Sequence, residues 1–206
     1  MRLAVAAALA ALTLCAAGTL DVFDLHWSVP DAADWKIDRE DSVPVLRLLK
    51  AREPLPGPRR PIQFAVAETP AYRRLTIEAD AMPLGEGLMV VFAYRDAAHF
   101  NYAHLATNTG VQFPVHNGIM HVYGGERVRI SPESGPPAFT ASGRWHHVKL
   151  EHDAATGAVS VTVDGRANPA LSAVDRSLGA GKIGLGSFDE TGAFKNVKIG
   201  VEGSGS

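Results

Sequence analysis

Residues 145–164 read WHHVKLEHDAATGAVSVTVD, and this stretch decides the fold class. In its second half, the valines at 159, 161 and 163 alternate with Ser160 and Thr162. A period of two places the apolar side chains of a β-strand on one face and the polar ones on the other. A second strand candidate, 145–152, precedes it, and the linking residues 153–157 end in glycine, as many hairpin loops do. The stretch therefore predicts a β-hairpin whose three valines face a core.

The same pattern recurs along the rest of the chain. Further strand candidates are 75–80, 88–94, 100–105, 118–123, 127–130, 181–188 and 194–201. The 20 glycines and 13 prolines suit short strands joined by turns, and no stretch is a convincing amphipathic helix. The prolines within 53–61 forbid a helix or a central strand there, so we expect a long loop. The sequence predicts an all-β sandwich or barrel.

The N-terminus has the three-part pattern of a secretory signal. Arg2 precedes an apolar run of about a dozen residues, and small residues follow up to Gly18. The run is too short to span a bilayer, which needs about 20 apolar residues. We expect residues 1–17 to be a signal peptide and the product to be periplasmic or extracellular. Lipoprotein anchoring at Cys15 is less favoured, because Leu14 rather than a small residue precedes it.

One domain is expected between residues 22 and 200, followed by a flexible tail at 201–206 that ends in Gly and Ser. The single cysteine lies in the expected signal, so the product would form no disulfide. The formal net charge of -2 gives no basic field. We therefore expect neither a nucleic acid nor an anionic membrane as a partner.

Four runs in the second half follow a recognisable order: 143–152, 159–165, 181–188 and 194–199. This order resembles that of laminin-G-like, concanavalin A-like domains, and VFAYRDAAHFNYAHL at 91–105 resembles their central strands. Among bacterial proteins the chain looks most like the exported DUF1080 domains, also called 3-keto-disaccharide hydrolase-like. The resemblance implies a two-sheet antiparallel jelly-roll sandwich. The sequence departs from the pattern at Lys195, where many carbohydrate-binding relatives carry an acid.

A surface for a ligand is expected between residues 99 and 129. Strand alternation puts Tyr102 and His104 on one face of a strand, and His121 and Tyr123 on one face of a later strand. If those faces coincide, they form the aromatic and imidazole-lined surface that suits sugars. The alternative is that each histidine is an ordinary hydrogen-bonded strand residue. The expected ligand-binding residues are His99, Tyr102, His104, His116, Asn117, His121, Tyr123, Arg127 and Arg129.

Catalytic and metal-binding motifs are harder to find. The sequence has no nucleophile elbow, phosphate-binding glycine loop or catalytic cysteine. If the protein is an enzyme, we expect Asp96, His104 and His121 to carry acid–base chemistry on a glycosidic bond. No cofactor is required. Calcium is possible at Asp189 and Glu190, for which an acidic hairpin turn is the favoured alternative.

Three functional hypotheses follow. The first is an exported carbohydrate-recognition domain that binds an oligo- or polysaccharide on the concave face of a sheet. The alternative is a glycoside hydrolase of the 3-keto-disaccharide hydrolase-like type, or a lyase, and the second alternative is a structural protein-interaction domain. The catalytic hypothesis requires His104, His121 and a carboxylate to converge. The binding hypothesis requires exposed aromatic rings such as Tyr102 and Tyr123.

Overall fold

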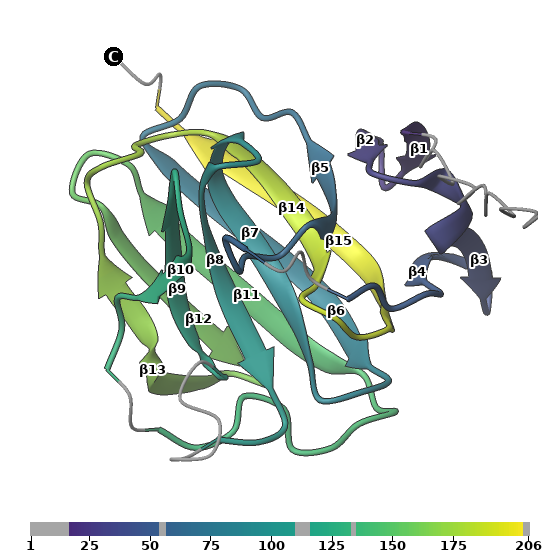
Figure 1. Cartoon of the computed structure of the whole chain (residues 1–206). Coiled ribbons are helices and arrows are strands. Elements are labelled where there is room, and N and C mark those ends of the chain that lie inside the picture. The colour runs from purple at the N-terminus through teal and green to yellow at the C-terminus, as the bar shows by residue number, and fades with distance from the viewer. Residues whose placement is uncertain (1–16, 54–56, 110–115, 133–134, 204–206) are drawn as a thin grey trace, which may run out of the picture.

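The computed structural model describes residues 17–53, 57–109, 116–132 and 135–203, which form two antiparallel β-sheets packed face to face (Figure 1). In these ranges the one helical element is a 3₁₀ turn, η1 (Ala32–Asp34). None of the described helical structure is long and apolar enough to cross a membrane. The predicted all-β sandwich is therefore confirmed. The expected signal peptide lies outside the described residues apart from Ala17.

Sheet A contains eight strands within the described residues, in the order β1-β2-β5-β14-β7-β8-β9-β10. Their bounds are Gly18–Val22 (β1), Leu25–Val29 (β2), Gln63–Ala67 (β5), Lys182–Ser187 (β14), Gly87–Asp96 (β7), His99–Ala106 (β8), Gly118–Tyr123 (β9) and Arg127–Arg129 (β10). The first strand thus begins before residue 22, where the sequence placed the domain start.

Sheet B contains seven strands in the same described ranges, in the order β13-β12-β11-β6-β15-β4-β3. Their bounds are Arg166–Val174 (β13), Ala158–Val163 (β12), His146–Asp153 (β11), Arg74–Pro83 (β6), Gly192–Glu202 (β15), Val43–Leu48 (β4) and Trp35–Glu40 (β3). Val201 and Glu202, expected in a flexible tail, belong to β15.

The hairpin predicted from residues 145–164 is formed by β11 and β12. Leu150 lies opposite Val161 and Val148 lies opposite Val163. Directly opposed residues of an antiparallel pair share a face, and all four of these side chains are buried. Lys149 and Thr162 share the outer face. The hairpin prediction is confirmed.

Two apolar clusters stabilise the sandwich through the removal of hydrophobic surface from water. The larger one fills the space between the sheets and includes Leu88, Val90 and Phe92 of β7. The second covers the outer face of sheet A and consists of Phe64, Met89, Val91, Phe100, Tyr102, Met120, Val122 and Phe188, with Val66 and Tyr94 packed against it. This second cluster explains why β7 is apolar on both faces.

The segment that links β4 to β5, described at 49–53 and 57–62, crosses over the strands (Figure 1). The backbone N–H of Arg127 donates to the carbonyl of Arg59 (3.2 Å), and Arg60 Nη1 donates to the carbonyl of Gly125 (3.4 Å). In sheet A four strands separate β5 from β10. The sheet therefore curves enough to bring its β10 edge back to the chain that enters β5, so its outer face is concave.

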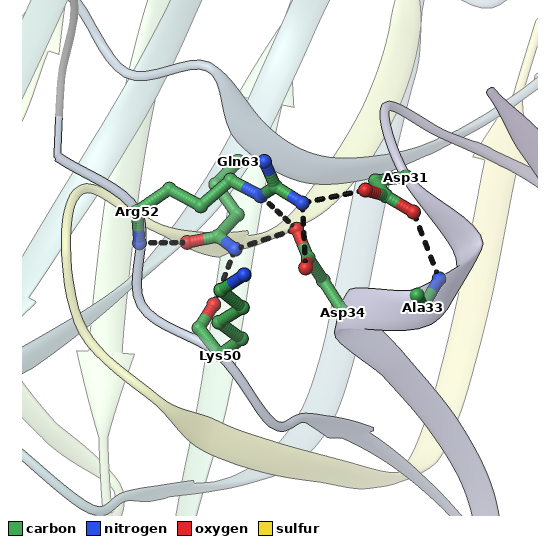
Figure 2. A network of polar contacts seen from close by, with 6 residues as sticks. All are labelled: Asp31, Ala33, Asp34, Lys50, Arg52 and Gln63. Carbon is green, nitrogen blue, oxygen red and sulfur yellow. Dashed lines mark hydrogen bonds and ion pairs between the residues drawn. The ribbon is translucent and has the colours of Figure 1, made fainter. Parts of the chain in front are cut away.

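A polar network fixes the start of this linking segment (Figure 2). The guanidinium of Arg52 pairs with Asp34, which is 2% exposed, and with Asp31 (2.5 Å). The amide of Gln63 accepts from the backbone N–H of Arg52 (3.1 Å) and donates to Asp34 (3.2 Å) and to the carbonyl of Lys50. Arg52 is thus held between η1 and the first residue of β5.

Lys195 has a structural role in sheet B. Its ammonium lies 4.1 Å from the centre of the Trp145 ring and pairs with Glu40 at 3.3 Å. An acid could make neither contact, because a cation–π interaction and this ion pair both need a positive charge. Trp145 is half-buried in this contact.

Candidate functional site

The pairing of β8 with β9 decides which of the predicted residues meet. Tyr102 lies opposite Met120, and Asn101 lies opposite His121. Opposed residues share a face, so His121 and Tyr123 lie on the other face of sheet A from Tyr102 and His104. The condition that the two faces coincide is therefore not met. Consequently the expected catalytic combination of Asp96, His104 and His121 does not assemble on one surface.

One group of residues gathers at the end of the concave face, and we call it the concave-face cluster. It comprises Glu86, Tyr102, His104, His116, Arg127, Arg129, Asp189 and Glu190. The ring centres of Tyr102 and His104 lie 6.4 Å apart, and those of His104 and His116 lie 5.1 Å apart. Seven of the eight were selected from the sequence as ligand or calcium candidates. Glu86 was missed, because nothing in its local sequence links it to β8.

Two residues position the His116 end of this cluster. Arg129 donates through Nη2 to the carbonyl of His116 (2.6 Å) and through Nη1 to the carbonyl of Asn117 (3.3 Å). The buried amide of Asn117 accepts from the N–H of Ala138 (2.9 Å) and donates to the carbonyl of Pro136 (2.8 Å). Asn117 was expected to touch a ligand, but its buried amide instead holds the 136–138 loop.

Two hydrogen-bond donors in the concave-face cluster have no partner among the residues that the structure describes. The hydroxyl of Tyr102 and Nη1 of Arg127 are both buried, and neither forms a hydrogen bond with any described residue. The rest of the Arg127 guanidinium lies over the ring of Phe188, 4.1 Å from its centre. Burial raises the pKa of Tyr102, so its hydroxyl keeps its proton. Leaving such a group unbonded costs about 1–3 kcal/mol, and buried polar groups seldom lack partners.

Carboxyl groups and the imidazole of His116 lie near these two donors. Burial raises the pKa of Asp189 and of Glu190, while burial lowers the pKa of His116. His116 Nδ1 lies 2.5 Å from Asn108 Oδ1 and 4.0 Å from a carboxylate oxygen of Glu86. The cluster thus combines carboxyl groups that hold protons more tightly than usual with a neutral imidazole. Such groups both donate and accept hydrogen bonds.

The remaining predicted residues form a second group on the other face, at the edge of the sandwich. His121 Nδ1 lies 2.8 Å from Asn101 Oδ1 and 3.2 Å from Asp175, and Asn101 donates to Asp175 (2.7 Å). Tyr123 is 61% exposed, with its ring stacked on that of His121. Asp96 and His99 pair at 2.9 Å beside it. Asp175 was missed, because its place next to β9 results from sheet packing and has no local signal.

Within the described ranges, no group of three or more His, Cys, Asp or Glu side chains is arranged to hold a metal ion. Calcium at Asp189 and Glu190 therefore stays a prediction.

Comparison with known proteins shows the fold. No family model matches the chain, and no curated protein matches it in sequence. Carbohydrate-binding module CBM66 from Bacillus subtilis superposes with a TM-score of 0.59 at 16% identity, over 84% of this chain and 94% of that one. A candidate glycosyl hydrolase from Parabacteroides distasonis ATCC 8503 superposes with a TM-score of 0.53 at 15% identity, over 84% of this chain and 92% of that one. The predicted concanavalin A-like jelly-roll fold is confirmed, whereas the narrower resemblance to DUF1080 domains stays a prediction.

Proposed function

We propose that the protein is an exported carbohydrate-recognition domain that binds an oligo- or polysaccharide at the concave-face cluster. The pair of unbonded donors, Tyr102 hydroxyl and Arg127 Nη1, carries this proposal. Both atoms are shielded from solvent in the structure, so a sugar oxygen would accept from them, and offset the cost of their burial, only once the side chains that cover them move aside. The fold that this chain shares with a carbohydrate-binding module supports the proposal.

The other members of the cluster supply complementary contacts. Asp189 and Glu190 accept hydrogen bonds from sugar hydroxyls, and Arg127 presents a positive charge to an anionic or keto sugar. Phe100, Tyr102 and Phe188 are buried, so they support this face from beneath and do not offer a sugar the exposed ring that the binding hypothesis asked of Tyr102. We expect His116, held neutral by burial, to accept or donate according to the hydroxyl it meets.

A glycan array with product detection, followed by calorimetric titration of the best ligand, tests this proposal. Arg127→Met removes the donor and should weaken binding about tenfold or more, because charge-assisted hydrogen bonds are the strong ones. Arg144→Met, at an exposed arginine outside the cluster, should bind as the parent does. The proposal fails if no glycan binds, or if the two variants bind equally well.

Hydrolysis or elimination at the same cluster is the second candidate. It is favoured by burial, which raises the pKa of Asp189 and of Glu190 and so brings these carboxyl groups closer to the range of a general acid that protonates a leaving oxygen. Glu190→Gln should then abolish product formation while binding persists. Binding without products would exclude this candidate, and neither binding nor products would favour a protein-interaction role.

A further inference from the structure

A row of aromatic rings crosses the concave face and ends at a cavity. From the His104 end, the ring centres of Tyr102 and Phe100 lie 6.0 Å apart, and those of Phe100 and Tyr94 lie 5.9 Å apart. Tyr94 lines a cavity of about 890 Å³ at the end of the sandwich opposite to the concave-face cluster. The cavity walls are residues 69–73, 94–95, 154–155 and 179–182, from four separate parts of the chain.

The walls of this cavity carry positive charge. Arg73, Arg95 and Lys182 line it, and its described lining contains no Asp or Glu. Lys182 pairs with Glu68 at 2.5 Å. Arg73 and Arg95 form no ion pair with any described residue, so their charges remain available to a ligand.

Arg95 is held in place before any ligand arrives. Its Nε and Nη2 both donate to the carbonyl of Leu178, at 3.1 and 2.5 Å. Nη1 makes no hydrogen bond within the described parts of the chain. Around it, the wall residues Ala71, Ala154, Gly179, Ala180 and Gly181 are small. A fixed guanidinium in a cavity with small walls needs little ordering to meet an anion.

We propose that this cavity binds an oxyanion-bearing ligand, whose carboxylate or sulfate meets Arg73 and Arg95 while its body packs against Tyr94. Guanidinium groups bind carboxylate and sulfate oxygens with strong, directional hydrogen bonds. Tyr94 is half-buried and offers part of its ring to the body of the ligand. An acidic sugar presents both features. This inference stands apart from the glycan site at the concave-face cluster.

Calorimetric titration of the full chain at low ionic strength tests the inference, with glucuronate, glucose and inorganic sulfate as probes. We expect glucuronate or sulfate to bind and glucose not to bind at this cavity. Arg73→Gln should weaken anion binding about tenfold. Within the described ranges the Arg73 side chain makes no hydrogen bond or ion pair, so the substitution should leave the fold intact. Glu68→Gln, which frees Lys182, should leave affinity unchanged or increase it. Comparison of the affinities for glucuronate and for sulfate shows whether the cavity prefers a carboxylate or a sulfate group.

Arg166→Gln is the matched control, because it removes the same charge from an exposed arginine outside the cavity. The inference is overturned if neither anion binds, or if Arg166→Gln weakens binding as much as Arg73→Gln does. Arg127→Met reports on the other site, because Arg127 lies in the concave-face cluster and not in the lining of this cavity. If Arg127→Met abolishes anion binding while Arg73→Gln does not, the anion binds at the concave-face cluster and the inference is overturned.

Discussion

The hydroxyl group of Tyr102 has no hydrogen-bond partner among the described residues, although its side chain is fully buried. Tyr102→Phe should therefore unfold no more easily than the parent, and removal of the unsatisfied group can raise the free energy of unfolding by about 1 kcal/mol. The same variant should bind the glycan more weakly. Urea denaturation and calorimetric titration measure the two effects.

Tyr72 provides the matched control at the residue scale. Its hydroxyl is equally buried but contacts His152 Nδ1 (3.3 Å) and the N–H of Gly181 (3.4 Å). Tyr72→Phe should therefore lose about 1 kcal/mol of stability. Equal effects of the two substitutions would show that the Tyr102 hydroxyl is bonded in the free protein, and would remove the main support for the proposed site.

At the scale of the secondary-structure elements, the position of the segment between β4 and β5 is fixed by the ion pairs and hydrogen bonds of Arg52. Arg52→Met leaves the carboxylate of Asp34 buried without its partner, which should cost about 3–5 kcal/mol in the free energy of unfolding. Lys36→Gln breaks an exposed pair with Asp38 and should change the free energy of unfolding little, because exposed ion pairs are screened by solvent. Chemical denaturation of both variants checks the difference. A small loss in Arg52→Met would mean that the network does not anchor the segment.

The strands themselves could be predicted from the sequence, because alternation and turn residues are local. The register between neighbouring strands, and hence which side chains share a face, could not always be predicted. A short turn joins β11 to β12 and fixes their register, so the inward valines were predicted correctly. By contrast, residues 107–117 separate β8 from β9. A link of that length leaves the register to tertiary packing, and a slip of one residue exchanges the two faces. That is why the sequence left open whether His121 shares a face with Tyr102, and the structure places the two on opposite faces.

For the whole molecule, buried His152 sets a pH dependence of stability. Burial lowers its pKa from an ordinary 6.5 to about 4, so the unfolded chain binds this proton more readily than the folded protein. The contribution to stability is complete above pH 6.5 and is lost as the pH falls toward 4. The loss amounts to about 3 kcal/mol. Urea unfolding between pH 7 and 4 should show it, and His152→Leu should reduce that slope. An unchanged slope would assign the pH dependence to other groups.

The position of β15 has a consequence for the newly made chain. This last strand lies between β6 and β4, with Lys195 opposite Val45, about 150 residues earlier. Sheet B therefore cannot close until the polypeptide has left the ribosome as far as β15, and pairings so distant in sequence form slowly. If the N-terminal segment acts as the predicted signal, a secretion channel would meet a chain that has not yet folded. The order of the strands would then keep the chain unfolded, and so competent for translocation, until it has been exported.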